Sequence, residues 1–187
     1  MKLTIAFLIL SLSISVANAQ RYVTKTGHIR FFSSTPVENI EANNHQVNAA
    51  IDSQTGDIVF KVLMKSFQFE KALMQEHFNE NYVESDKYPN STLVGKITNI
   101  KDIDFTKNGK YDVIIEGDLT IKDVTKKIKE KGTIEVNGDN LKGLSTFNIQ
   151  PEDFNIKIPG AVAAHIAKSV RVDVDADFQK SAKAPVR

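Results

Sequence analysis

The segment around His77 is the part of this sequence where acid–base chemistry could take place. His77 lies beside Glu76 and three residues before Glu80, so an imidazole and two carboxylates fall within a short stretch of chain. One hypothesis is therefore an enzyme in which His77 and a nearby carboxylate act as acid and base. A metal site is not predicted there, because the His-Glu-x-x-His spacing is absent and adjacent helical side chains point about 100° apart.

Two other acidic groups could be mistaken for catalytic or calcium-binding sets. Glu152 and Asp153 are adjacent, and Asp173, Asp175 and Asp177 alternate along the last apolar segment. Adjacent carboxylates are typical of a solvated turn. Alternate residues of a strand lie on one face, about 6–7 Å apart, without the glycine-turned loop that gathers calcium ligands. We therefore predict no catalytic residue and no metal site.

The composition narrows the function classes further. The chain has 187 residues, 41% of them hydrophobic and 25% charged, which is the balance of a globular protein. Lys and Arg number 24 against 23 Asp and Glu, so nucleic acid is not an expected partner. There is no cysteine, which excludes disulfides, thiol catalysis and cysteine-ligated zinc or iron–sulfur sites. No cofactor is predicted.

The N-terminal residues have the pattern of a signal peptide. A basic start is followed by the apolar run Leu3–Val16 and by Ala17-Asn18-Ala19, which predicts cleavage after Ala19. The run is shorter than the about 20 residues of a spanning helix, so stable membrane insertion is not expected. With no cysteine, export suggests a bacterial periplasmic or secreted protein. We expect one domain over residues 20–180, and a frayed tail over 181–187.

Period-two alternation of apolar and polar residues dominates the mature chain and predicts about eight strands. Short glycine-containing turns, such as Asn108-Gly109 and Asn137-Gly138-Asp139, favour antiparallel hairpins. Helical spacing is expected over Glu70–Tyr82 and again over Ala161–Lys168. The predicted strands are Arg21–Phe32, His45–Asp52, Asp57–Ser66, Ser91–Ile103, Lys110–Ile121, Lys126–Val136, Asn140–Asn148 and Val170–Phe178.

Strands with one apolar face must bury that face, and eight of them can do so by closing into a barrel. An eight-stranded barrel is just wide enough to be filled by side chains or to hold one small ligand. Gly95, Gly117, Gly132 and Gly143 fall in phase with the apolar positions of their strands. These glycines either leave free volume inside the barrel or let the strands bend, and the two roles are compatible.

Two longer motifs resemble the YceI-like family of periplasmic or secreted lipocalin-like proteins that bind polyisoprenoid lipids. Met74–Pro89 is similar to the family's helix that ends in an acidic-x-Tyr-Pro turn, and Gly117–Lys126 is similar to its Gly-x-Leu-Thr-Ile hairpin. Phe154–Ile156 and Ile166–Val174 also look similar. The resemblance implies an eight-stranded antiparallel lipocalin-like β-barrel with one or two short helices, enclosing a long apolar pocket.

The favoured hypothesis is therefore a non-enzymatic protein that sequesters or transports a long-chain isoprenoid, for example a quinone-like one, or another apolar lipid. An apolar tail needs shape and apolar lining rather than charged groups. The enzyme using His77 and a solid-core interaction module remain alternatives, and the oligomeric state is left open, a dimer included. The predicted ligand-binding residues are Phe60, Val62, Met64, Phe67, Phe69, Leu73, His77, Phe78, Ile97, Val113, Ile115, Leu119, Ile134, Phe147 and Phe154.

The basic run Lys126–Lys131 also has two interpretations. It could steer an anionic lipid or a membrane surface toward the barrel. Lysines on a strand edge also commonly serve only to prevent edge-to-edge association.

Overall fold

The computed structural model describes residues 20–181, so the predicted signal peptide with cleavage after Ala19 lies outside the described residues. The predicted tail lies outside them as well, except that the last strand extends to Ser181. The strands are β1 (Arg21–Ser34), β2 (Asn39–Asp52), β3 (Asp57–Leu63), β4 (Gln68–Phe69), β5 (Asn90–Ile97), β6 (Gly109–Ile121), β7 (Val124–Asn137), β8 (Asn140–Ile149) and β9 (Val170–Ser181).

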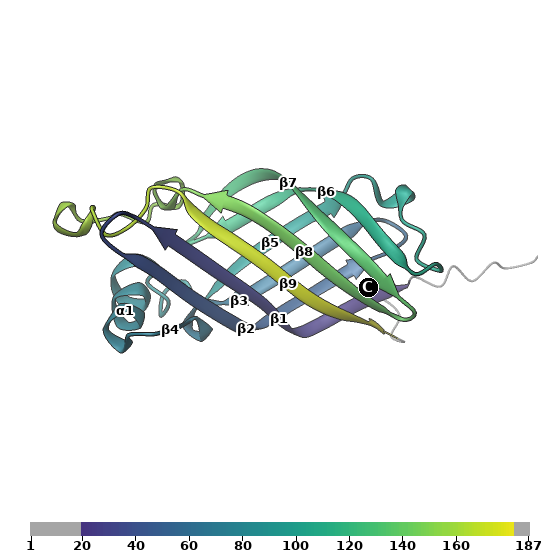
Figure 1. The fold of residues 1–187 in the computed structure, drawn as a ribbon, viewed down its shortest axis with the longest axis horizontal. Helices are drawn as coiled ribbons and strands as arrows, with labels where there is room; N and C mark the ends of the chain where they lie inside the picture. Colours follow the sequence, from purple (N-terminus) through teal and green to yellow (C-terminus); the bar gives the residue numbers. More distant parts are fainter. Residues whose placement is uncertain (1–19, 182–187) are drawn as a thin grey trace, which may run out of the picture.

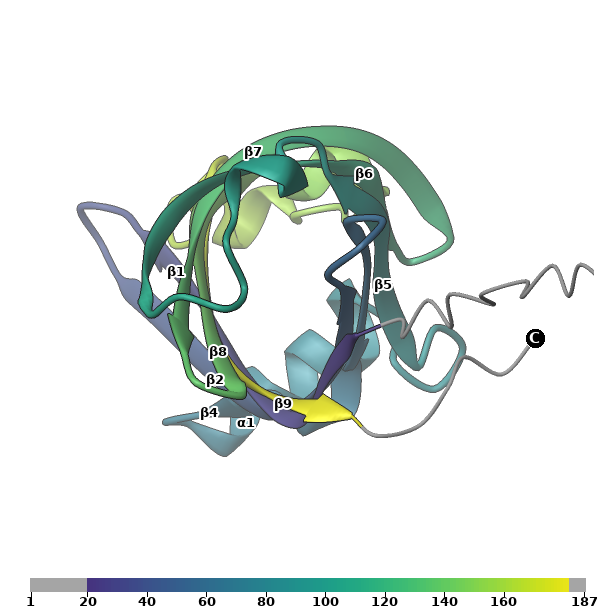
Figure 2. The ribbon, with the colours of Figure 1, turned by 90° about the vertical axis from the view of Figure 1, so that its right-hand side faces the viewer.

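Eight long strands form a closed antiparallel barrel, which confirms the predicted fold class (Figure 1). The sheet runs β1-β9-β8-β7-β6-β5-β3-β2, and the additional pairing of β1 with β2 joins its ends. Figure 2, turned so that one end of the barrel faces the viewer, shows the strands as a ring. The two-residue strand β4 lies outside this ring, on the edge of β2 at Ala42 and Asn43.

Helical structure is shorter than the sequence predicted. The first segment forms the α-helix α1 (Ala72–His77) and continues as the wider π-helical turn η2 (Phe78–Tyr82). The prediction of a helix over Ala161–Lys168 is wrong, because only the 3-10 turn η5 (Gly160–Val162) forms there. A helix needs several consecutive turns to offset its costly nucleus, and this short segment follows a Pro-Gly pair. The other 3-10 turns are η1 (Met64–Ser66), η3 (Ile100–Asp102) and η4 (Pro151–Phe154).

The two ends of the barrel differ. At one end the connection between β5 and β6 supplies Ile103, which is 7% exposed, and Phe105, whose ring stacks on Tyr22 at a centroid distance of 5.8 Å. These side chains join the inward residues of the strand ends in one core cluster that closes this end. The opposite end carries α1, β4 and the connection between β8 and β9 (Figure 1). We call this opposite end the mouth.

Two glycines face each other across β5 and β6 and allow the strands to approach closely. Gly95 pairs with Gly117. A Cβ on Gly95 would lie 2.4 Å from the Glu116 carbonyl oxygen, and a Cβ on Gly117 would lie 2.7 Å from that of Val94. No real Cβ tolerates such distances, so these positions support the strand-bending role. Gly143 borders the interior cavity, and a Cβ added there would lie 3.2 Å from the Phe178 ring, so this glycine makes room for that side chain.

We predict that Gly117→Ala destabilises the barrel, because its Cβ would meet backbone atoms that cannot move independently of the sheet. Overpacking of this kind typically costs about 1–3 kcal/mol. Chemical denaturation followed by circular dichroism measures the free energy of unfolding. Gly160→Ala is the matched control, since a Cβ added at Gly160 would meet no atom within 4 Å beyond its chain neighbours. Equal stabilities of the two variants would contradict the close-approach argument.

Candidate ligand-binding site

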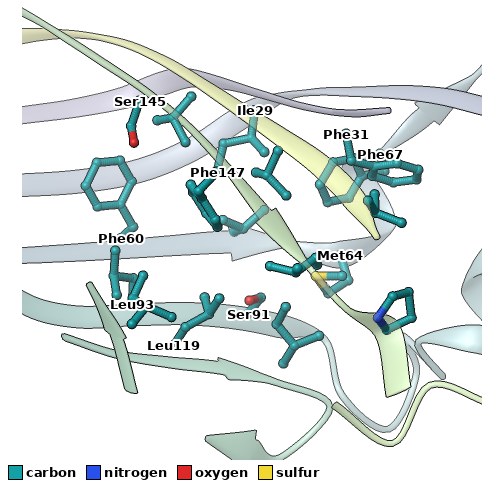
Figure 3. A pocket seen from close by; sticks show the side chains of 18 of the residues that line it. Ile29, Phe31, Phe60, Met64, Phe67, Ser91, Leu93, Leu119, Ser145 and Phe147 are labelled. Carbon is teal, nitrogen blue, oxygen red and sulfur yellow. The ribbon is translucent and has the colours of Figure 1, made fainter. Parts of the chain in front are cut away.

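The barrel contains a cavity of about 520 Å³ that runs from the core cluster of the closed end, where Ile58, Ile97 and Phe178 line it, to the mouth. Its wall is almost entirely apolar and combines inward residues of the strands with residues of α1, η2 and the β8–β9 connection. Figure 3 shows side chains from several strands pointing into this space, with Phe60, Leu93 and Ser145 toward one end and Phe31 and Phe67 toward the other. The volume is on the scale of small-molecule sites, about 300–1,000 Å³.

Most of the predicted ligand-binding residues lie on the cavity wall. They are Phe60, Val62, Met64, Phe67, Phe69, His77, Phe78, Ile97, Val113, Ile115, Leu119, Ile134 and Phe147. Their contact with a ligand stays a prediction.

Two predicted residues need correction, because they do not line the cavity. Leu73 is 60% exposed, since the helix is short and turns this side chain outward. Phe154 is only 3% exposed, and it packs in η4 with Ile156 as part of the core cluster near the mouth.

The first and last strands contribute wall residues that were not predicted from the sequence. Ile29 and Phe31 of β1, and Val172 and Val174 of β9, also line the cavity. Register shifts around Gly27 break the alternation in β1, so the sequence pattern did not show which of its residues face inward. The strict alternation of β9 did carry the signal, but it predicted only the strand and not its contact with the cavity.

Four phenylalanine rings form a cluster beside the mouth. Phe31 of β1 lies 5.3 Å from Phe67, 5.5 Å from Phe69 and 5.5 Å from Phe78, measured between ring centroids. The Phe69–Phe78 distance is 5.1 Å. Tilted and edge-on pairs at such distances are the favoured geometries of aromatic side chains. The cluster therefore joins the barrel wall to β4 and η2, and gives the cavity a rigid apolar rim.

One carboxylate connects three separate segments at the mouth. Glu38, in the β1–β2 turn, accepts a hydrogen bond from Lys71 Nζ at 3.1 Å and pairs with His165 Nδ1 at 3.2 Å. Lys71 immediately precedes α1, and His165 lies in the β8–β9 connection. Nearby, the backbone N–H of Ala167 donates to Ser33 Oγ at 2.8 Å. The hydrogen bond from Lys71, with a smaller contribution from His165, holds the pKa of Glu38 below its usual value.

His77 lies at the rim of the cavity, with an exposed side chain. In the part of the chain that the structure describes, it forms no hydrogen bond or ion pair with a carboxylate. No group of three or more His, Cys, Asp or Glu residues suited to a metal ion occurs among residues 20–181. None of the helices in that range is long and apolar enough to cross a membrane.

The acidic residues of β9 and η4 lie on the outside of the barrel. Asp173 accepts from Arg30 Nη2 at 2.7 Å and from Thr146 Oγ1 at 2.9 Å, and Asp175 pairs with Lys142 at 2.8 Å. These contacts connect β1, β8 and β9 on their outer faces. Glu152 and Asp153, in turn, are exposed residues of η4. Neither group resembles a catalytic pair.

The barrel wall is split on the mouth side between β7 and β8. Their pairing runs from Asn137 and Asn140 only as far as Gly132 and Ser145. Beyond this point the first half of β7, residues 124–131, pairs with β6 alone, so the basic run Lys126–Lys131 does lie on a strand edge. The first inward residue of β7 beyond the last pair is Glu130, which lines the cavity and was not predicted from the sequence. The sequence feature that could have identified Glu130 is its position in the alternation of β7, on the same face as Ile128 and Ile134.

Comparison with known proteins agrees with this geometry. The YceI-like domain family matches residues 14–178. A polyisoprenoid binding domain from Saccharophagus degradans implicated in plant cell wall breakdown has 12% sequence identity and a TM-score of 0.76, over 87% of this chain and 99% of that one.

Two further solved structures share the fold. BcnA of Burkholderia cenocepacia has 16% identity and a TM-score of 0.68, over 81% of this chain and 95% of its own. A YCEI protein of Campylobacter jejuni has 15% identity and a TM-score of 0.57, over 76% and 85%. At these identities the likeness establishes the fold. No curated protein matches the sequence.

We predict that Glu38→Gln loosens the mouth, because the neutral amide cannot form the two charge-assisted contacts. Hydrogen–deuterium exchange should become several-fold faster at Ala167 and in α1, and stay unchanged in β6. The wild-type protein should show the same loosening in acid, because the pKa of Glu38 is depressed in the folded state. The contacts are fully present when the pH is above the ordinary pKa of a glutamate, and they are lost as the pH falls through the lowered pKa of Glu38.

Glu76→Gln is the matched control, since Glu76 is an exposed carboxylate of α1 without an ion pair among the described residues. Faster exchange at Ala167 in both variants, or in neither, would show that the Glu38 contacts do not hold the mouth together.

Proposed function

Because the chain belongs to the YceI-like family, whose domain it matches over residues 14–178, we propose that its barrel holds a long-chain isoprenoid-type or other apolar lipid and serves to sequester or transport it. The observation that carries this proposal is the apolar cavity of about 520 Å³, which reaches the mouth of the barrel. The Saccharophagus degradans neighbour, described as a polyisoprenoid binding domain, supports the ligand class.

The physical basis is burial of hydrocarbon. Each CH₂ group moved from water into an apolar site contributes about 0.8 kcal/mol. A tail of several isoprene units therefore has enough driving force to offset the loss of its translational and conformational freedom. The wall supplies little hydrogen bonding, so selectivity for the tail comes from shape and from the exclusion of water. Met64 and Met74 add flexible side chains that can adapt to an irregular tail.

The two alternatives have less support. A barrel whose interior is filled by side chains does not fit a cavity of about 520 Å³. An enzyme centred on His77 would need an acid–base partner within hydrogen-bonding reach, and within residues 20–181 no carboxylate forms a hydrogen bond or ion pair with this imidazole. A binding protein without catalytic chemistry is therefore the function that the site supports best.

Export is the cellular setting that suits this proposal. The pattern of residues 1–19 predicts a signal peptide, and the absence of cysteine is compatible with an oxidising compartment. A protein that shields an oily molecule from water has a use where lipids must cross an aqueous space. We therefore include a periplasmic or secreted location in the proposal.

We predict that the protein purified without detergent from a bacterial host retains an isoprenoid-type lipid, which mass spectrometry of an organic extract detects. Leu93→Trp should lower the amount of bound lipid at least about tenfold, because the larger side chain occupies the cavity. A loss of about 1.4 kcal/mol of binding energy already gives that factor. Leu93 points into the cavity in Figure 3, beside Phe60 and Leu119.

Val94→Trp is the control, because Val94 is the next residue of β5 and is 57% exposed on the outside. It should retain as much lipid as the wild-type protein. Lipid-free protein from every host, or equal retention by the two tryptophan variants, would contradict binding inside the barrel.

A further inference from the structure

Glu130 is the charged residue that interrupts the apolar wall at a distance from the mouth. It occupies an inward position about midway along β7, opposite Ile115 of β6, and it borders the cavity. The other titratable residues of the wall, such as Glu38, His77 and His165, lie at the mouth end. Glu130 also lies at the point where β7 and β8 separate, beside the last pair between them, Gly132 and Ser145.

Among residues 20–181, no side chain compensates this carboxyl. In the described part of the chain Glu130 forms no hydrogen bond or ion pair, whereas its neighbour Lys129 points outward and pairs with Glu116 at 2.7 Å. Partial burial raises the pKa of Glu130 above its ordinary value, because desolvation disfavours the ionised form. A half-buried carboxylate without a partner is less well solvated than one in water, whereas an apolar residue at this position would pack against Ile115 without that cost.

One polar side chain lies next to this carboxyl across the split. Ser145 of β8 pairs with Gly132, the next inward position of β7 after Glu130, and also lines the cavity. The Ser145 hydroxyl donates to the Lys131 carbonyl at 2.7 Å, which satisfies the carbonyl just past the end of the β7–β8 ladder. The lone pairs of Ser145 Oγ remain able to accept. Glu130 and Ser145 thus form a polar spot about midway along a largely apolar wall.

We infer that this spot binds the polar end of the ligand, that Glu130 is its specificity-determining residue, and that this end is an uncharged hydroxyl-bearing group. The inference rests on the proposed function, because it assumes a lipid in the cavity. A hydroxyl donates to a carboxylate and accepts from a protonated carboxyl, so it pairs with Glu130 in either state. A phosphate or fatty-acid carboxylate would instead face like charge in a medium that screens it poorly.

The experiment compares two probes that differ in one oxygen: geranylgeraniol, a four-unit isoprenoid alcohol, and the corresponding hydrocarbon. Each radiolabelled probe is allowed to partition between phosphatidylcholine vesicles and the protein, and the bound fraction is measured. Because the vesicles are the same in every experiment, the values of all variants can be compared directly. The wild-type protein should prefer the alcohol at least about tenfold, the lower end for a hydrogen bond to a charged group. Glu130→Leu should remove the preference by weakening alcohol binding and tightening hydrocarbon binding.

Glu135→Leu is the matched control, because Glu135 lies on the same strand with an exposed side chain on the outer face. It should preserve the preference of the wild-type protein. An alcohol-to-hydrocarbon ratio that Glu130→Leu leaves unchanged would overturn the inference and leave the proposed function intact. Failure of the wild-type protein to take up either probe would overturn both, so the two failures are distinguishable.

A second measurement uses the wild-type protein alone, in case Glu130→Leu does not fold. Nuclear Overhauser contacts between the carbinol CH₂ of bound geranylgeraniol and the Glu130 side chain are expected. Contacts of that CH₂ with mouth residues such as His77, and none with Glu130, would overturn the inference.

Discussion

Closure of the sheet through the double pairing of β1 is the constraint on which the rest of this structure depends. β1 pairs with β9 along one edge and with β2 along the other, so the strands form a ring. A ring of fixed circumference keeps opposite walls apart, and inward side chains meet only where they are long enough or where a connection fills the end. Aromatic and branched side chains close one end. The rest of the axis remains open as a cavity.

The same closure is incomplete in one place, between β7 and β8. β7 extends past its last pair with β8, which leaves a strand edge that carries lysines on its outer face and Glu130 on its inner face. Cross-strand ion pairs with β6, such as Lys127–Asp118 at 3.2 Å, occupy part of the basic run. Exposed edges invite association, and charged residues reduce that risk. A carboxyl at the apex of the split lies within reach of both the cavity and water, and this makes its presence in an apolar wall physically tolerable.

Two kinds of interaction hold the segments of the mouth together, aromatic packing and charged contacts. The phenylalanine cluster around Phe31 and Phe78 joins η2 to the wall by packing, whereas Glu38 joins the β1–β2 turn, α1 and the β8–β9 connection by charge. Packing of aromatic rings is insensitive to pH and salt. Exposed ion pairs are weak and screened by salt. The mouth is therefore held on one side by apolar packing and on the other by contacts that depend on pH and salt.

Sequence patterns were enough to predict the strands, their antiparallel order, the closed barrel and part of the cavity wall. This was possible because period-two alternation records which face of each strand is buried, and because the motifs at Met74–Pro89 and Gly117–Lys126 resemble one family. The tertiary structure was needed to show that Leu73 faces solvent, that residues 161–168 form no α-helix, and that Glu130 lies without a partner where β7 and β8 separate. Alternation along the sequence assigns a residue to one face of a strand. The register between strands, the strand lengths and the packing of the connections decide which other residues, or which part of the cavity, that face contacts.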